Sequence, residues 1–269
     1  MTQNLTLAAS HAKSCYMIKV RSHIERKLLQ QAGHIVALCH DVLKNTVQPG
    51  ISGLALDAIV EEIIRSNDAD PIFKGYCGFP NATCISINHG VVHGIPSNQL
   101  LEEGDIVAID IGVKYKGYVG DSAWTYPVGN ISDEKKKLLV HTEKALWEGL
   151  RVIKAGIHLS NISHAIGQYA TQHKLSIVKE LGGHGVGTTL HEPPEIPNYG
   201  KPNQGPILKA GMILAIEPIC NLGHSAIKTL QDGWTVVTKD GKDSAHFEHT
   251  IAVEEEGYTI LTTLMQDSF

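Results

Sequence analysis

The sequence has no long apolar stretch and no signature of export. No uninterrupted apolar run reaches the roughly 18 residues that a membrane-spanning helix needs. The first twenty residues also lack a basic segment followed by an apolar core, which is the pattern of a secretory signal. We therefore expect a protein that stays in the cytoplasm and has no membrane partner.

Cysteine pairs and a strong charge are also missing. The five cysteines are scattered, odd in number and form no Cys-x-x-Cys motif, which excludes a structural zinc knuckle and fits a reducing cytoplasm. The net charge of -5 argues against a general nucleic-acid or anionic-membrane surface. What is present is a chain of 269 residues with 42% hydrophobic residues, enough for a sizeable core. We expect small or peptidic ligands.

Two parts of the chain repeat one pattern. Residues 101–110 read Leu-Glu-Glu-Gly-Asp-Ile-Val-Ala-Ile-Asp, and residues 208–217 read Leu-Lys-Ala-Gly-Met-Ile-Leu-Ala-Ile-Glu, at an offset of 107 residues. Upstream, Gly50-Ile51 and Gly156-Ile157 each precede a helical pattern, at an offset of 106 residues. The chain therefore reads as two copies of one α+β unit.

Apolar residues recur at helical spacing in four segments. The expected helices cover about 19–44, 54–66, 132–153 and 160–174. The duplication favours a single domain over residues 16–269, built from two interlocked halves at about 45–125 and 152–255. Residues 1–15 show no periodicity and are expected to form a flexible tail.

Residues 106–121 are predicted to form a β-hairpin with an acid on each strand. An even-numbered turn within residues 114–117 puts Asp110 and Asp121 on one face of the hairpin, either directly opposite or diagonal. A single strand-end aspartate most often caps a turn. Two carboxylates facing each other in an apolar strand pair repel and lose hydration, unless a positive charge lies between them. A metal ion is the obvious candidate.

The second half of the chain adds two more strand carboxylates. A second central strand is expected at about 212–219 and carries Glu217, the acid that matches Asp110 in the repeat. A final hairpin is expected to pair 234–238 with 245–253, which puts Glu248 in mid-strand. Each acid alone could have a purely structural role, as a turn cap or an exposed edge residue, but together the four acids suggest one functional site.

The four acids, if they converge, carry a charge that two divalent cations would balance. His184 lies in a glycine-rich stretch and supplies a nitrogen ligand that can approach closely. Oxygen-rich ligation with one imidazole and no thiolate suits a catalytic dinuclear site that keeps open positions for water.

These residues resemble a known family of enzymes. The ordered set Asp110, Asp121, His184, Glu217 and Glu248 looks like that of the pita-bread metallopeptidases, and most closely the type I methionine aminopeptidases. The resemblance runs from about residue 18 to residue 263. Its most specific motifs are Gly-Tyr-Cys-Gly-Phe-Pro-Asn-Ala-Thr-Cys-Ile-Ser-Ile-Asn at 75–88, Val-His-Gly-Ile-Pro at 92–96, Gly-His-Gly-Val-Gly at 183–187 and Glu-His-Thr at 248–250.

The same ligand order occurs in related peptidases that differ in other respects. Prolidases and proline aminopeptidases usually carry a large N-terminal domain, whereas only about 90 residues precede His93 here. Type II methionine aminopeptidases insert a helical subdomain between the last two glutamates, whereas Glu217 and Glu248 are only 31 residues apart. A type I enzyme is the better match.

The resemblance implies a fold and a chemistry. The fold is α+β, with two αβ halves related by a pseudo-twofold axis and a central curved antiparallel sheet flanked by helices. Asp110 would bind one metal ion through both oxygens, and Asp121 and Glu248 would bridge two ions. His184 and Glu217 would complete the second ion, and a bridging water or hydroxide would be the nucleophile.

Three further roles come from the resemblance. Glu217 is a candidate general base, and His93 and His191 match the histidines that hold the substrate carbonyl and the scissile amide nitrogen. Tyr76, Phe79, Cys84 and Trp234 match the lining of a methionine pocket, although such residues are also common in a plain core.

Three residues depart from the family pattern. They are Phe73 in place of a cysteine, Gly112 in place of a threonine and Leu190 in place of a phenylalanine. The departures put the shape of the pocket and the support of the metals in doubt, but not the class of enzyme.

The resulting hypothesis is an aminopeptidase that removes the initiator methionine from nascent polypeptide N-termini when the second residue is small. Manganese, iron, cobalt, zinc and nickel all suit the ligand set, and Asn88 and Ser244 match a site for a monovalent cation, sodium or potassium. Relatives suggest a monomer, and ribosome docking would use the catalytic domain's own surface. The alternatives are a peptidase that cleaves X-Pro bonds and a non-catalytic binding protein with the same fold.

Overall fold

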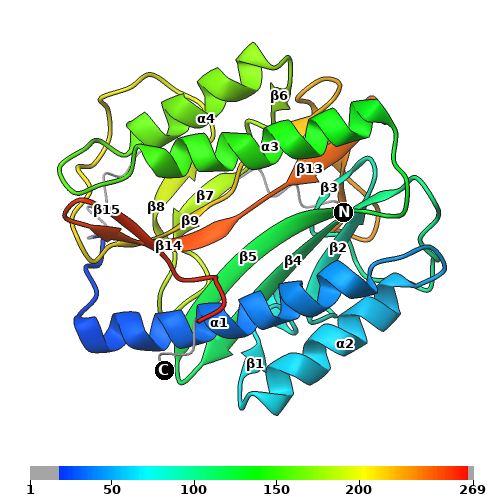
Figure 1. Cartoon of the computed structure of the whole chain (residues 1–269), viewed down its shortest axis with the longest axis horizontal. Coiled ribbons are helices and arrows are strands. Elements are labelled where there is room, and N and C mark those ends of the chain that lie inside the picture. Colours follow the sequence, from blue (N-terminus) through cyan, green and yellow to red (C-terminus); the bar gives the residue numbers. More distant parts are fainter. Residues whose placement is uncertain (1–17, 266–269) are drawn as a thin grey trace, which may run out of the picture.

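Four helices cover the strands in the computed structural model, which describes residues 18–265 (Figure 1). They are α1 (His23–Thr46), α2 (Gly53–Ser66), α3 (Asp133–Arg151) and α4 (Ser160–Gln172). The first three begin behind the serines Ser22, Ser52 and Ser132, whose hydroxyls accept hydrogen bonds from the first helical turn. The four helices expected from the sequence are confirmed. Within the described residues, none is both long and apolar enough to cross a membrane.

The predicted hairpin forms the centre of the first half. Strands β4 (Ile106–Tyr115) and β5 (Tyr118–Pro127) are joined by the two-residue turn Lys116-Gly117, with φ angles of 45° and 86°. Such positive angles are typical of the tight turn that matches the twist of a hairpin. Asp110 pairs with Ala123 and Gly112 pairs with Asp121, so the two aspartates are diagonal neighbours on one face. The predicted parity is confirmed.

Two further strands of the first half flank this hairpin. β4 also pairs with β1 (Asp70–Pro71) and β2 (Thr83–Ile87), in the order β1-β4-β2. The single-turn helix η1 (Tyr76–Gly78) lies in the connection between them. All of these strand pairs are antiparallel.

The second half contributes a five-stranded antiparallel sheet and most of two smaller sheets. The large sheet has the order β15-β14-β9-β7-β8. Its strands are β7 (Gly182–Gly185), β8 (Glu192–Pro197), β9 (Ile213–Ile216), β14 (His249–Glu254) and β15 (Gly257–Ile260). One small sheet joins β13 (Ser244–His246), β10 (Ile219–Asn221) and β6 (Ser176–Ile177), and the other joins β11 (Ile227–Thr229), β12 (Val236–Thr238) and β3 (Gly90–Val92).

The sequence repeat is also a repeat of hydrogen bonds. The Gly50 amide donates to the Leu101 carbonyl at 2.8 Å, and the Gly156 amide donates to the Leu208 carbonyl at 2.9 Å. The two turn glycines have nearly the same φ, 90° and 88°, in the left-handed region that glycine adopts without strain. The two halves therefore share one scaffold, as the duplication predicts.

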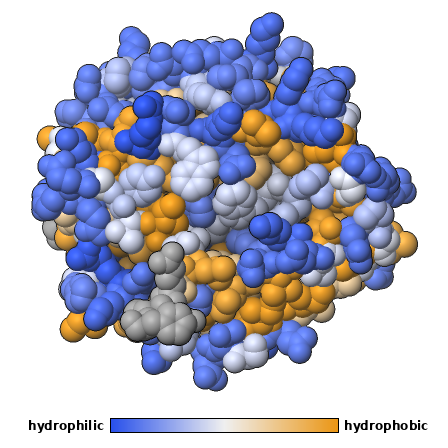
Figure 2. All heavy atoms as spheres, in the orientation of Figure 1, coloured by the Kyte–Doolittle hydropathy of each residue, from blue (hydrophilic) through white to orange (hydrophobic). Residues whose placement is uncertain are grey.

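Each half has its own apolar core between helices and sheet. In the first half, α1 and α2 pack on the β4 sheet through residues such as Val36, Leu56 and Ile109. In the second half, α3 and α4 pack on β9, β10 and β14. Figure 2 shows the face that carries α1 and α3: hydrophilic side chains line the rim over α3, and the largest hydrophobic area lies over α1 and α2.

Two predictions about the strands are wrong. The expected final hairpin does not form, because β12 pairs with β11 and β3, whereas β13 pairs with β10, and β14 pairs with β9 and β15. Glu248 consequently lies between β13 and β14, and its amide donates to the Ala123 carbonyl of β5 at 2.8 Å.

The expected strand 212–219 is interrupted at Pro218, which has no amide hydrogen to donate. The expected tail, residues 1–15, lies outside the described residues.

Candidate active site

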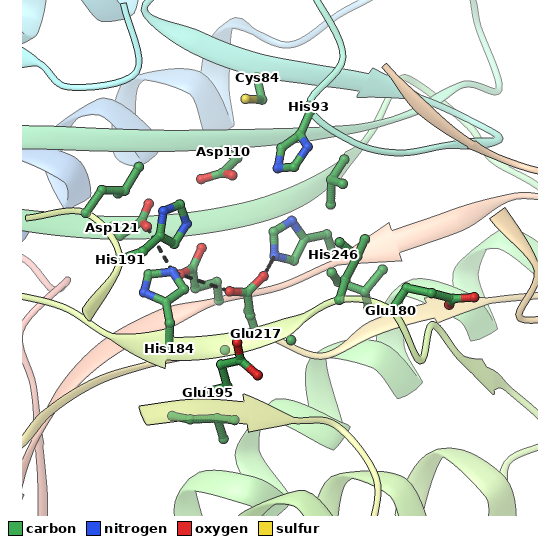
Figure 3. A pocket seen from close by; sticks show the side chains of 18 of the residues that line it. Cys84, His93, Asp110, Asp121, Glu180, His184, His191, Glu195, Glu217 and His246 are labelled. Atoms are coloured by element: carbon green, nitrogen blue, oxygen red, sulfur yellow. Dashed lines mark ion pairs between the residues drawn. The ribbon is translucent and has the colours of Figure 1, made fainter. Parts of the chain in front are cut away.

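A cavity of about 870 Å³ lies where the two halves meet. Both halves line it, and Figure 3 shows side chains from several strands that converge on it. Every residue predicted to act in catalysis, substrate binding or metal binding lies on its wall. These residues are Tyr76, Phe79, Cys84, His93, Asp110, Asp121, His184, His191, Glu217, Trp234 and Glu248.

Close packing of strands positions His184. It lies on β7 between Gly183 and Gly185, and β7 runs between β8 and β9. A Cβ atom on Gly183 would collide with the Ala215 carbonyl, and one on Gly185 would collide with the Pro193 carbonyl. Only glycine allows the three backbones to approach so closely, which explains why the imidazole is flanked by glycines.

Side-chain hydrogen bonds position the two glutamates. Glu217 follows β9, and its carbonyl accepts a hydrogen bond from the Asn198 amide at 2.9 Å. Glu248 lies against β5, and its carbonyl accepts a hydrogen bond from the Ser122 hydroxyl at 2.6 Å. The carbonyls of both glutamates therefore bond to side chains and not to the backbone of a neighbouring strand.

The predicted metal ligands form a compact group. His184 Nε2 lies 3.6 Å from an Asp121 carboxylate oxygen and 3.5 Å from a Glu217 carboxylate oxygen. Ligand atoms of Asp121, His184 and Glu248 all lie within 4.8 Å of one another. One buried carboxylate oxygen each of Asp110, Asp121 and Glu248 has no hydrogen-bond partner. Since buried polar atoms are normally paired, three such oxygens beside an imidazole fit a divalent cation.

The electrostatics of the group fit the same conclusion. Burial raises the pKa values of Asp110 and Glu217 to about 7. It raises the pKa values of Asp121 and Glu248 well above their usual range, and the negative charges of neighbouring carboxylates raise these two further. Burial lowers the pKa of His184 and keeps its imidazole neutral. Buried carboxylates are unfavourable as bare anions, and a metal ion that displaces their protons removes this penalty. Together with a neutral imidazole they form a suitable donor set for such an ion.

His93 and His191 lie on the same cavity wall as this group. His93 follows β3, and the His191 ring lies 4.4 Å from the His184 ring between centroids. Tyr76 OH is hydrogen-bonded to His191 Nδ1 at 2.9 Å. Burial lowers the pKa of both histidines, so each is a neutral imidazole at pH 7. A neutral imidazole can donate one hydrogen bond to a peptide carbonyl and accept one from a peptide amide.

The predicted methionine pocket is an apolar end of the cavity. The Phe79 and Trp234 rings meet edge to face at 5.1 Å between centroids, and Cys84 is buried beside Phe79 in one apolar cluster. Burial raises the pKa of the Cys84 thiol well above its usual value, so the thiol stays neutral.

The three departures from the family pattern lie in or beside this cluster. Phe73 and Leu190 belong to it. A Cβ on Gly112 would come within 2.5 Å of the Phe73 ring. The large residue at 73 and the missing side chain at 112 therefore compensate each other.

At the predicted monovalent-cation site, the Ser244 amide donates to the Asn88 carbonyl at 3.0 Å. The Lys135 ammonium group donates to the Asn88 side-chain oxygen at 2.8 Å and to the Gly104 carbonyl at 2.7 Å. A fixed positive charge thus already contacts this part of the structure.

One cavity residue, His246, was missed by the sequence analysis. It is buried on β13, and its Nε2 lies 3.3 Å from the Glu217 carboxylate (Figure 3). Residues two apart in an extended segment point to the same side. His246 precedes Glu248 by two residues, and this spacing was the signal that could have revealed it.

Comparisons with known proteins agree with this geometry. Residues 27–255 match the model of metallopeptidase family M24. The chain is 56% identical to methionine aminopeptidase 1 of Bacillus subtilis over 246 residues, which cover 91% of this chain and 99% of that protein. The crystal structure of methionine aminopeptidase from Thermotoga maritima has a TM-score of 0.91 at 41% identity, covering 92% of this chain and 100% of that one.

A second crystal structure, of methionine aminopeptidase from Rickettsia prowazekii, has a TM-score of 0.90 at 38% identity, covering 91% of this chain and 100% of that one. The likeness confirms the α+β pita-bread fold. The chain therefore belongs to metallopeptidase family M24 and, within it, to the type I methionine aminopeptidases.

Proposed function

We propose that the protein is a metal-dependent aminopeptidase that removes the N-terminal methionine from nascent proteins and peptides. One observation carries the proposal: unpartnered carboxylate oxygens and a neutral imidazole lie beside an apolar pocket in one cavity. The relatives are named as methionine aminopeptidases, which supports this reading over the cleavage of X-Pro bonds. A binding protein without activity would have no need for this set of carboxylates.

We assign metal binding to Asp110, Asp121, His184, Glu217 and Glu248. Four carboxylates balance two divalent ions in charge, which supports a dinuclear centre. When bound, such a centre supplies a water of lowered pKa and polarises the scissile carbonyl. Manganese, iron, cobalt, zinc and nickel all suit this oxygen-rich set with one imidazole.

The other residues bind and orient the peptide. Glu217 is suited to accept a proton, because its carboxylate lies within the ligand group, 3.5 Å from His184 Nε2. His93 and His191 hold the scissile carbonyl and amide as neutral hydrogen-bond partners. Phe79, Cys84 and Trp234 accept the methionine side chain, and their aromatic edges suit its sulfur.

The remaining parts of the proposal concern the substrate and its setting. A small second residue is required, because the substrate passes between His93 and His191. We further propose a monomer that acts in the cytoplasm on chains leaving the ribosome. Every residue assigned above lies on the wall of this one cavity, so a second copy is not needed to complete the site. Size-exclusion chromatography with light scattering tests this, and a stable dimer would contradict it.

The decisive test replaces one ligand. Asp110→Asn should lower the turnover of a Met-Ala-Ser peptide by more than about 100-fold, since even residues that only support metal ligands are worth about 10- to 100-fold. Asp133→Asn is the control, because that side chain is 90% exposed at the start of α3. Circular dichroism should show both variants folded. Retained activity in Asp110→Asn, or faster cleavage of Ala-Pro-Ala than of Met-Ala-Ser by the unmodified enzyme, would overturn the assignment.

A further inference from the structure

A buried ion pair links the start of α1 to the segment that carries His191. Arg21 directly precedes the N-cap of α1, and Glu192 is the first residue of β8. The guanidinium group contacts the Glu192 carboxylate, and the two side chains are only 6% and 8% exposed. Desolvation makes such pairs costly, and an apolar pair would often be as stable. A buried pair at this place therefore suggests a geometric role.

The Glu192 side chain folds back and binds the loop residues that precede it. Its carboxylate accepts hydrogen bonds from the Thr188 amide at 2.9 Å and from the Thr188 hydroxyl at 3.2 Å. The Thr189 amide donates to the same oxygen at 3.4 Å. One carboxylate thus organises residues 188–192. Burial alone would raise the pKa of Glu192, but the charge of Arg21 and these hydrogen bonds hold it below its usual value.

Arg21 is held in place by contacts other than the one with Glu192. The Arg21 amide donates to the Gly211 carbonyl at 2.8 Å, and its side chain also contacts Glu25 on the first turn of α1 at 3.4 Å. A Cβ on Gly187 would collide with the guanidinium group. The Val119 amide donates to the Gly187 carbonyl at 2.8 Å, which ties the loop to β5 as well. Arg21 therefore fills the space that the glycine leaves open.

His191 immediately precedes Glu192 and is itself an exposed residue. Its ring is hydrogen-bonded to Tyr76 OH. The ring contacts the side chains of Tyr76 and His184 at the wall of the cavity, whereas its backbone lies outside the apolar cores, so the position of that backbone depends on the anchors of the loop. We propose that the Arg21–Glu192 pair is a positioning device that holds His191 against the substrate. The catalytic part of this inference rests on the proposed function.

The geometry of the pair indicates that Glu192 needs an arginine as its partner and not just any nearby positive charge. Lys19 also lies near Glu192, at 3.8 Å, but its side chain is 57% exposed. A lysine ammonium is a flexible, strongly hydrated point charge, whereas the planar guanidinium group presents several donors in a fixed geometry. Lys19 therefore does not replace Arg21 when the latter is removed.

The experiment compares two ion pairs at the same end of one helix. Arg21→Met removes the proposed device. Arg26→Met removes the pair between Arg26 and Glu254, which is 3.0 Å long and has side chains that are 29% and 36% exposed. With metal-loaded enzyme and Met-Ala-Ser, we expect kcat to fall about 10-fold or more in Arg21→Met, since small misplacements of a catalytic group can cost about 100-fold. Arg26→Met should remain within about twofold.

A double-mutant cycle with His191→Ala shows whether Arg21 acts through His191. In the His191→Ala background, Arg21→Met should lower kcat no further. Independent losses that multiply would overturn the proposal, and so would an unchanged kcat in Arg21→Met. If Arg21→Met does not fold, Glu192→Gln serves instead. It keeps the acceptor for Thr188 but removes the charge, and it should lower kcat with the same dependence on His191.

A second measurement does not depend on activity. In a spectrum of histidine side chains labelled with ¹⁵N, Arg21→Met should shift the His191 imidazole signal, and Arg26→Met should leave it in place. An unmoved signal in Arg21→Met would refute the positioning role. If the unmodified enzyme failed to cleave Met-Ala-Ser, the proposed function would fall, but this measurement would still decide whether the pair positions His191.

Discussion

The two halves of the chain share a scaffold but hold their carboxylates in different ways. Asp110 lies within a continuous ten-residue strand, where β2 pairs on one side and β5 on the other. Its counterpart Glu217 lies in a break between β9 and β10, next to Pro218. A regular ladder positions the first carboxylate, whereas the single side chain of Asn198 supports the backbone of the second. The second half therefore depends more on individual residues.

The halves also differ in what they bring to the cavity. The first half supplies Phe79, Cys84 and His93 together with both aspartates. The second half supplies His184, His191 and His246 together with both glutamates. Both halves thus contribute candidate metal ligands, whereas three of the four cavity histidines come from the second half.

The largest expected effect concerns the proposed divalent cation, whose candidate ligands come from both halves. Asp110 and Glu217 have folded pKa values of about 7, above their values of about 4 in an unfolded chain. The folded metal-free protein therefore binds more protons, and its stability should fall as the pH rises from about 4 to about 7. A bound divalent ion removes this penalty and should add more than about 4 kcal/mol when present at 1,000 times its Kd.

Thermal melts with manganese or with EDTA, at pH 5.5 and pH 8, test this prediction. The gain in melting temperature from metal should be larger at pH 8, where protons no longer compete for the carboxylates. Equal gains at both pH values would contradict the assignment of these carboxylates as ligands.

The next effect compares one glycine from each half. Gly183→Ala places a Cβ against the Ala215 carbonyl, and this backbone cannot move without disturbing β9. We expect a loss of about 3 kcal/mol or more in the free energy of unfolding. Gly112→Ala places a Cβ against the Phe73 and Ile72 side chains, which can shift, so about 1–2 kcal/mol is expected.

Urea denaturation at pH 7 measures both losses. Adding Phe73→Cys to Gly112→Ala opens the space around the new methyl group and should recover part of the loss, whereas it should not help Gly183→Ala. Equal losses for the two glycine variants would show that both halves are equally constrained.

A third prediction removes the support of Glu217. Asn198→Ala leaves the Glu217 carbonyl without its donor and opens a small cavity, and it should cost about 2 kcal/mol of stability. It should also weaken metal binding, measured by titration calorimetry, because Glu217 is then less well fixed. Asn45→Ala, which removes an exposed amide at the end of α1, is the control. An unchanged affinity in Asn198→Ala would mean that the broken strand needs no side-chain support.

The smallest expected effect lies in the helices. His40 on α1 and Leu146 on α3 each lie ten residues before the turn glycine of their half, and both are buried. Burial lowers the pKa of His40 to about 3, and its ring is hydrogen-bonded to Tyr126 and Ser122. The unfolded chain therefore binds a proton that the folded protein excludes, and the contribution of His40 to stability falls as the pH drops below about 6.5.

Between pH 7 and pH 5.5 the His40 contribution to this fall is about 1 kcal/mol. His40→Leu, which copies the second half, should remove it, although the variant also loses two hydrogen bonds at every pH. Urea midpoints at both pH values give the comparison. If the stability of both proteins changed by the same amount between pH 7 and pH 5.5, His40 would not be the group that titrates.

Local features of the sequence predicted much of the site. The hairpin with Asp110 and Asp121 was predictable, because side chains alternate along strands and the Lys116-Gly117 turn sets the pairing of the two strands. The repeat led to Glu217, and the glycines around His184 marked a close approach of backbones. Each of these signals lies within a few residues or in two matching segments.

The final strands could not be predicted in the same way. Strands β12 and β13 contain three residues each, so alternation alone does not select a partner. The partners come from distant parts of the chain, as when the Glu248 amide pairs with Ala123. The contact of His246 with Glu217 and the pairing of Arg21 with Glu192 arise from the same long-range packing.

The sequence by itself determined the two-fold scaffold, the hairpin that pairs the first two acids, and the identity of the five ligand candidates, because periodicity and turn chemistry act over short distances. The tertiary structure alone decided how the halves meet. Hydroxyl and amide groups such as those of Ser122 and Asn198 complete the backbone hydrogen bonds there, and burial between the halves shifts the pKa values of the carboxylates. Burial depends on every surrounding element at once, so no single segment of sequence encodes it.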